Sequence, residues 1–232
     1  MNLISANKKN ASLITALFAV LLCMASCGNK EKETASVPVG DTTQTAPAAN
    51  TKTVVFFGNS LTAGYGLSPT EAFPALIQAK IDSMGLPYKV VNAGVSGETT
   101  SGGASRIDWV LRQAPDVFVL ELGANDGLRG IPVAETRKNL QAIIDKVKGK
   151  NPAAKLVLAG MQLPPNMGQA YTSGFRDLFP ELARRNGMTL IPFLLQDVGG
   201  EAKLNQQDGI HPTAEGARIV ADNVWEVLQP LL

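Results

Sequence analysis

The sequence contains very little histidine and cysteine. His211 is the one histidine among 232 residues, and the two cysteines, Cys23 and Cys27, both lie near the N-terminus. A zinc site closed by protein ligands needs four side chains, mostly cysteine and histidine at short spacings. We therefore expect no metal site of this kind. The single imidazole is either incidental or has one specific use.

Neither acidic nor basic side chains are in marked excess. The chain has 21 basic and 20 acidic side chains, a formal charge of +1, and no concentrated basic tract beyond Lys8 and Lys9. This balance gives no electrostatic reason to expect a nucleic-acid partner. Hydrophobic residues, in contrast, make up 45% of the chain, which is enough for one sizeable core.

The first 26 residues are typical of a bacterial lipoprotein signal peptide. Two lysines precede an apolar run at 11–22, which is shorter than the ~20 residues that span a bilayer. The segment MASC that follows resembles a lipobox in which Met24 replaces the more usual leucine. It predicts cleavage before Cys27 and lipid attachment to Cys27. Ordinary secretion with an incidental cysteine is the alternative.

Residues 27–50 are predicted to be the lipidated cysteine and a flexible linker. The segment is polar and rich in Ala, Thr and Pro, and such a composition cannot bury a core. The mature chain would keep one cysteine, so we expect no disulfide within it. We expect the protein in the cell envelope, held to a membrane by its lipid. Gly28 and Asn29 follow Cys27, in place of the aspartate that marks inner-membrane retention in some bacteria, which favours the outer membrane.

From residue 51 onward, short apolar runs alternate with helical patterns. The apolar runs are typical of buried strands, and the helical patterns begin or end at proline, glycine or cationic residues. This alternation predicts one domain, residues 51–232, with an α/β fold: a three-layer α/β/α sandwich around about five parallel strands, of the flavodoxin-like kind. The expected strands are 53–58, 88–94, 116–123, 154–160 and 188–193, and the expected helices are 71–85, 102–114, 132–150, 173–187 and 213–232.

Polar residues with possible chemical roles follow the predicted strands. In parallel sheets, ligands bind outside the carboxyl ends of the strands. Ser60 follows the first strand, Gly97 follows the second, and Asn125 follows the third. The irregular segment after the fifth strand leads to Asp208 and His211. We therefore expect these residues to gather along one edge of the sheet.

Asp208 and His211 are separated by two residues in a turn that contains glycine. Such a turn can place a carboxylate beside one imidazole nitrogen and leave the other nitrogen free as a base. The alternative is a surface histidine beside an ordinary turn residue. Ser60 is a candidate nucleophile or a helix N-cap. The G-x-S-x-G pattern fails around Ser60 at Thr62, and Ser96 remains a weaker competing nucleophile.

An acyl-transfer site also needs hydrogen-bond donors for a developing oxyanion. Gly97 offers an unobstructed backbone N–H, and Asn125 offers a side-chain amide. Both are also common turn residues, which is the alternative for each. Together with Ser60, His211 and Asp208, they supply a nucleophile, a base, an orienting acid and two donors, each at a predicted strand end.

These segments resemble the SGNH (GDSL) hydrolase superfamily, and within it the bacterial multifunctional acyl-thioesterase, lysophospholipase and arylesterase group. The resemblance implies that Ser60, Asp208 and His211 form a catalytic triad. It also implies that the Ser60 amide, Gly97 and Asn125 line an oxyanion hole. The matching blocks, in family order, are GNSLTAGYG (58–66), VVNAGVSGETT (90–100), ELGANDGLRG (121–130), LPPNMG (163–168) and DGIHP (208–212).

One residue departs from the family pattern. The first block of the family reads Gly-Asp-Ser, whereas this chain has Asn59 before Ser60. Asparagine keeps the size and one acceptor oxygen but loses the charge. Because Asp208 supplies the triad carboxylate, we expect the change to adjust local hydrogen bonding or pH dependence without abolishing catalysis.

The resemblance implies hydrolysis of ester or thioester bonds in small acyl esters or lysophospholipids, through an acyl-enzyme and without a metal or organic cofactor. We expect a monomer. A carbohydrate acetyl esterase and a non-catalytic lipid- or glycan-binding lipoprotein are the alternatives. The segment 161–175 corresponds to a loop beside the acyl pocket of similar enzymes. Its apolar candidates for that pocket are Met161, Leu163, Met167 and Tyr171.

Overall fold

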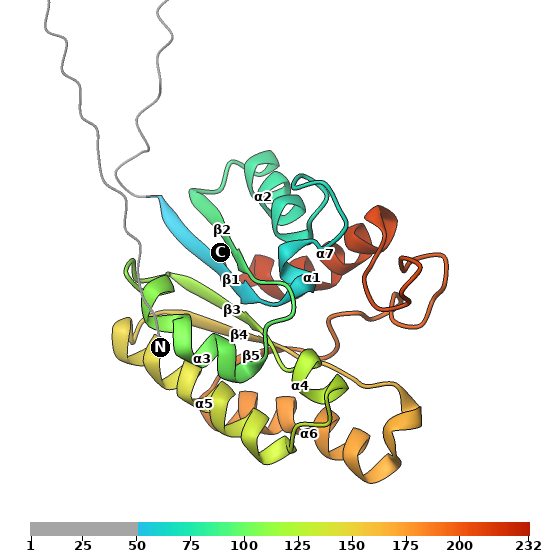
Figure 1. The fold of residues 1–232 in the computed structure, drawn as a ribbon. Helices are drawn as coiled ribbons and strands as arrows, with labels where there is room; N and C mark the ends of the chain where they lie inside the picture. Colours follow the sequence, from blue (N-terminus) through green and yellow to red (C-terminus); the bar gives the residue numbers. More distant parts are fainter. Residues whose placement is uncertain (1–50) are drawn as a thin grey trace, which may run out of the picture. The chain divides into compact units, whose positions relative to one another are not determined.

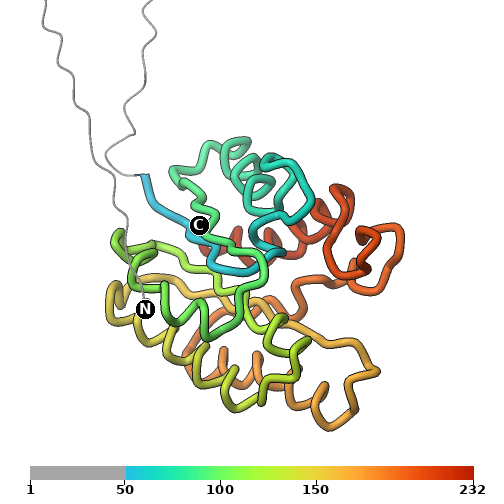
Figure 2. The backbone as a smooth tube through the Cα atoms, viewed as in Figure 1, coloured from blue at the N-terminus to red at the C-terminus, as the bar shows by residue number. Residues whose placement is uncertain are grey.

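The structure, a computed structural model, describes residues 51–232. The predicted signal peptide, Cys27 and the predicted linker lie outside the described residues. Figures 1 and 2 show the domain formed by the described part of the chain. It contains no helix that is long and apolar enough to cross a membrane.

Five parallel strands form the central sheet. They are β1 (Lys52–Gly58), β2 (Tyr88–Gly94), β3 (Val117–Glu121), β4 (Lys155–Ala159) and β5 (Thr189–Ile191). Their order in the sheet is β2-β1-β3-β4-β5, which is the flavodoxin-like arrangement. The strand number, the parallel pairing and the fold class predicted from the sequence are therefore confirmed.

Helices cover both faces of the sheet (Figure 1). One face carries α2 (Phe73–Ser83) and α7 (Ala214–Leu228), which pack against each other. The other face carries α3 (Thr100–Val110), α5 (Val133–Lys150) and α6 (Gln169–Asn186), with α5 packed against both of its neighbours. The predicted three-layer sandwich is thus confirmed.

Apolar side chains of the central strands fill the space on both faces of the sheet. Successive strand residues point to opposite faces, so neighbouring phenylalanines of β1 serve both layers. The Phe56 ring packs edge-on against Phe73 of α2, with centroids 5.4 Å apart, whereas Phe57 packs against Phe118 of β3 at 5.6 Å. All four side chains are buried.

Four short helical turns complete the structure: α1 (Ser60–Ala63), α4 (Ala124–Leu128), η1 (Pro165–Met167) and η2 (Gln229–Leu231). Two of them bear on the predicted site. Ser60 begins a helix, and Asn125 lies in α4 rather than in an open turn. The segment predicted as a loop at 161–175 is also partly helical, since α6 already starts at Gln169.

The carboxyl ends of the first three strands lie at one level of the sheet. Gly58, the last residue of β1, is in register with Gly94 of β2 and with Glu121 of β3. The segments that leave these strands therefore start side by side. This alignment positions the candidate site.

Candidate active site

Ser60 is presented at the first turn of α1. The Asn59 side chain caps this helix by accepting a hydrogen bond from the Leu61 amide at 2.9 Å. The preceding residue must be small, because a Cβ on Gly58 would lie 2.1 Å from Thr62 Oγ1 and 2.5 Å from a Glu121 oxygen. Ser60 is 8% exposed, so its hydroxyl is sheltered but reachable.

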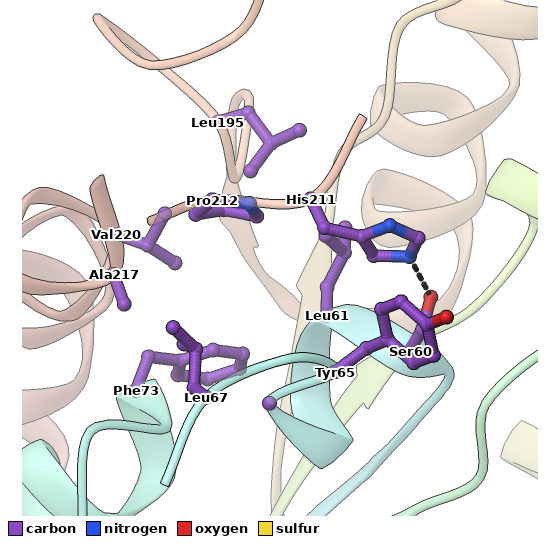
Figure 3. A pocket seen from close by; sticks show the side chains of 11 residues that line it. Ser60, Leu61, Tyr65, Leu67, Phe73, Leu195, His211, Pro212, Ala217 and Val220 are labelled. Carbon is purple, nitrogen blue, oxygen red and sulfur yellow. Dashed lines mark hydrogen bonds between the residues drawn. The ribbon is translucent and has the colours of Figure 1, made fainter. Parts of the chain in front are cut away.

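The structure brings His211 and Asp208 to Ser60. The Ser60 Oγ atom lies 2.8 Å from His211 Nε2, across 151 positions of sequence. The other ring nitrogen, Nδ1, lies 2.6 Å from Asp208 Oδ2. Figure 3 shows the imidazole directed at the serine hydroxyl. With Nδ1–H donating to the carboxylate, Nε2 is free to accept the serine proton.

Asp208 remains ionised over a wide pH range. The hydrogen bond from the His211 side chain, with backbone hydrogen bonds from His211 and Ile210, lowers the pKa of Asp208 to about 2. Asp208 Oδ1 accepts the two amides at 3.0 Å and 2.9 Å, which leaves Oδ2 for the imidazole. The turn DGIH therefore holds an oriented carboxylate beside the imidazole.

The segment that carries His211 is tied to the segment after Ser60 by Gln206. The Gln206 amide donates to the His211 carbonyl at 2.7 Å. Its side-chain Nε2 donates to the Tyr65 carbonyl at 2.7 Å and to the Pro212 carbonyl at 3.0 Å. The Tyr65 ring lies against the imidazole, with centroids 4.6 Å apart. Gln206 and Tyr65 were not predicted from the sequence.

The three predicted oxyanion donors lie in α1, in the β2–α3 connection and in α4. Within the described residues, the amides of Ser60 and Gly97 make no hydrogen bond. Gly97 has a φ of +80°, a conformation that favours glycine. Asn125 Nδ2 donates to the Glu98 carbonyl at 3.0 Å, and Arg129 donates to the Gly97 carbonyl at 3.0 Å. These bonds fix the connection that carries Gly97.

Ser96, the competing nucleophile, is exposed and makes no hydrogen bond to the imidazole; His211 Nε2 is bonded to Ser60 instead. Of the two serines, only Ser60 is hydrogen-bonded to the imidazole. Within residues 51–232, no group of three or more His, Cys, Asp or Glu side chains is placed to hold a metal ion.

A small pocket adjoins Ser60 and His211 (Figure 3). Its volume is about 10 Å³, enough for about one water molecule. Most of its wall is apolar and comes from α1, α2, α7 and the segments beside them. The lining residues besides Ser60 and His211 are Leu61, Gly64, Tyr65, Leu67, Phe73, Leu195, Pro212, Ala217 and Val220.

The four apolar residues expected at the acyl pocket do not line this pocket. Met161 is buried in the core. Leu163 packs over Gly127, where a Cβ would lie 2.4 Å from its Cδ2. The Tyr171 hydroxyl donates to the Ile131 carbonyl at 2.6 Å. Leu163 and Tyr171 therefore pack against α4 and the residues that follow it, and do not line the pocket beside Ser60.

Known proteins are similar to this chain in sequence and fold. Residues 56–219 match the GDSL-like Lipase/Acylhydrolase family. Esterase TesA of Pseudomonas aeruginosa is 39% identical over 185 residues, which cover 79% of this chain and 91% of the relative. Thioesterase 1/protease 1/lysophospholipase L1 of Escherichia coli K12 is 38% identical over 80% of this chain and 87% of the relative.

A solved structure agrees with these sequence matches. The psychrotrophic esterase EstA of Pseudoalteromonas sp., in a crystal structure inhibited by monoethylphosphonate, superposes with a TM-score of 0.73. It is 32% identical, and the match covers 78% of this chain and 98% of EstA. The chain therefore belongs to the GDSL-like lipase/acylhydrolase family and is a carboxylic ester hydrolase of the SGNH type.

Proposed function

We propose that Ser60, His211 and Asp208 hydrolyse carboxylic ester or thioester bonds through an acyl-enzyme. One observation carries the proposal: an unbroken chain of short contacts, 2.8 Å from Ser60 Oγ to His211 Nε2 and 2.6 Å from His211 Nδ1 to Asp208 Oδ2. This is the arrangement in which an imidazole removes a serine proton while a carboxylate stabilises the imidazolium.

The reaction takes two symmetrical steps. His211 Nε2 accepts the Ser60 proton as Oγ bonds to the acyl carbon, and the resulting imidazolium protonates the leaving alcohol or thiol. Water then attacks the acyl carbon and gives a proton to the same nitrogen. The bond from the acyl carbon to Oγ breaks, Nε2 returns the proton to Oγ, and the acid leaves. The Tyr65 ring beside the imidazole helps to stabilise its charged form, because aromatic rings attract cations.

The oxyanion formed in each step is held by the amides of Ser60 and Gly97 and by Asn125 Nδ2. Within the described residues the two amides make no hydrogen bond. Asn125 Nδ2 carries two hydrogens: one is bonded to the Glu98 carbonyl, and the other remains for the oxyanion. A donor of this kind stabilises a transition state by ~3 kcal/mol more than the ground state.

The surroundings of the triad favour acyl esters with a short or medium chain. The pocket beside Ser60 is small and apolar. Exposed apolar side chains also lie on the segments that carry the triad and the predicted donors: Tyr65 after α1, Val95 after β2, Leu128 in α4 and Ile210 next to His211. Similar proteins carry the names esterase, lysophospholipase and thioesterase. We infer small acyl esters as substrates, with lysophospholipids as one class.

A labelling experiment and a substrate panel test this function. A fluorophosphonate probe is expected to label the wild-type protein and not Ser60→Ala, while Ser96→Ala keeps full labelling. In parallel assays, 4-nitrophenyl acetate to octanoate and lysophosphatidylcholine are expected to be hydrolysed, and acetyl-xylan is not. Turnover of acetyl-xylan alone would identify a carbohydrate esterase. Absence of labelling and of all turnover would indicate a binding protein.

We also propose that the enzyme is a lipoprotein of the cell envelope, anchored through Cys27. The proposal depends on the sequence of the first 27 residues. Full-length protein expressed in a bacterium is expected to incorporate labelled palmitate and to sediment with membranes, whereas Cys27→Ser does neither. Incorporation into Cys27→Ser, or a soluble wild-type protein, would contradict the anchor.

A further inference from the structure

A buried carboxylate, Glu121, contacts the turn that carries Ser60 and has no role in the proposed reaction. Glu121 ends β3 and is 1% exposed. Its Oε1 accepts from Asn59 Nδ2 at 2.7 Å, and its Oε2 accepts from Thr62 Oγ1 at 2.8 Å. The backbone amides of Asn59 and Thr62 also donate to Oε2, at 3.1 Å and 3.3 Å. All four partners of Glu121 are donors and belong to the turn that carries Ser60.

This donor set favours an ionised carboxylate. Two backbone amides and Asn59 Nδ2 can only donate, so a protonated Glu121 could direct its hydrogen only at the Thr62 hydroxyl, which would then lose Glu121 as its acceptor. The Asn59 amide has one orientation that satisfies its neighbours. Its Oδ1 faces the Leu61 amide at 2.9 Å and the Ser60 hydroxyl at 3.4 Å, which leaves Nδ2 for Glu121.

Burial of the charged Glu121 carboxylate away from water is unfavourable, and its hydrogen bonds partly offset this desolvation. Burial raises the pKa of Glu121 to about 7, against the hydrogen bonds from Thr62 and Asn59. Within residues 51–232, no cation forms an ion pair with this carboxylate. Arg106 of α3 is paired with Glu98, and it contacts the turn only at the Gly58 carbonyl, 3.5 Å away. On the far side of Ser60, His211 is paired with Asp208. The hydrogen bonds that stabilise the ionised Glu121 therefore come only from neutral donors in the turn that carries Ser60.

We propose that Glu121 and Asn59 are a positioning pair for Ser60. The Asn59 amide donates a hydrogen to the Glu121 carboxylate. If an aspartate stood at position 59, two carboxyl groups would face each other and would have to share one proton in place of this hydrogen. The pair fixes the first turn of α1, and with it both Ser60 Oγ and the Ser60 amide. Its importance for catalysis depends on the proposed role of Ser60 as nucleophile.

The proposal predicts what aspartate would do at position 59. In Asn59→Asp, an oxygen replaces Nδ2 against Glu121 Oε1, and two buried carboxyl groups must hold one proton between them. A second carboxylate at this distance raises the pKa of that proton above its value in the unfolded chain. A group with a raised folded-state pKa stabilises the fold at low pH and loses this stabilisation as pH rises through the folded pKa.

The test compares the wild type, Asn59→Asp and the double variant Asn59→Asp/Glu121→Gln between pH 8 and pH 9.5. Glu121 of the wild type titrates near pH 7, below this range, so the wild-type pair adds little pH dependence within it. Asn59→Asp is expected to lose melting temperature and, because the pair supports Ser60, about tenfold in kcat over this range, with KM little changed. The double variant restores one amide facing one carboxylate and is expected to regain the flat profile.

Gln113→Glu is the matched control, since it adds the same charge at an exposed position between α3 and β3, away from the site. Superimposable profiles of Asn59→Asp and the wild type would overturn the proposal, and so would a double variant that fails to recover. Melting temperatures need no substrate. If the melting temperatures follow the expected pattern but the protein has no esterase activity, the proposed function is refuted. The proposed pairing of Glu121 with Asn59 is then still supported.

Discussion

Replacing His211 with alanine is expected to lower kcat by about 10⁴-fold or more. The chain has no second histidine, so no other imidazole can take over as base. Nε2 lies 2.8 Å from Ser60 Oγ, and a methyl side chain at position 211 leaves this hydroxyl with only the Asn59 oxygen at 3.4 Å. Since His211 acts on protons and not on acyl binding, KM is expected to change little.

Steady-state assays with 4-nitrophenyl butyrate measure this effect, and two controls define its cause. Ser60→Ala/His211→Ala is expected to be no slower than either single variant, because residues that act as a unit are not additive. Free imidazole is expected to restore part of the activity of His211→Ala, and none of the activity of Ser60→Ala. Near-native turnover by folded His211→Ala would exclude the proposed base.

The sheet and its edge were predictable because they depend on local patterns. A run such as TVVFFG, closed by glycine, has the composition of a buried strand, and it coincides with β1 (Lys52–Gly58). The 88–94 prediction matches β2 residue for residue. Once parallel strands are inferred, their carboxyl ends must share one edge. This geometry places Ser60, Gly97 and Asn125 on neighbouring segments without any knowledge of the reaction.

The supporting residues were harder to predict because their partners are distant in sequence. Gln206 acts through the Tyr65 carbonyl, 141 positions away, and it lies in a segment without helical or strand periodicity. Glu121 did leave a signal, since it is a carboxylate at the end of an otherwise apolar strand. A buried acid needs donors, but the sequence does not show that Asn59 and Thr62 provide them.

Asp208→Asn is the second substitution with a large expected effect, a loss of about 10³- to 10⁴-fold in kcat. Asp208 Oδ2 holds the proton of His211 on Nδ1 at 2.6 Å, and an asparagine amide can instead donate to Nδ1. The imidazole proton would then move to Nε2, which faces Ser60, and the ring could no longer accept the serine proton. Asp177→Asn, which removes the same charge from the surface of α6, is the matched control and is expected to keep full activity.

The single histidine makes the cause directly observable. In protein labelled with ¹⁵N-histidine, one imidazole gives every ring signal. The wild type at pH 8 is expected to show a protonated Nδ1 and an unprotonated Nε2, and Asp208→Asn the reverse. The loss of activity and the exchange of the two signals should occur together, because the carboxylate acts by selecting the tautomer. An active Asp208→Asn protein with exchanged signals would show that hydrolysis does not need Nε2 as the base.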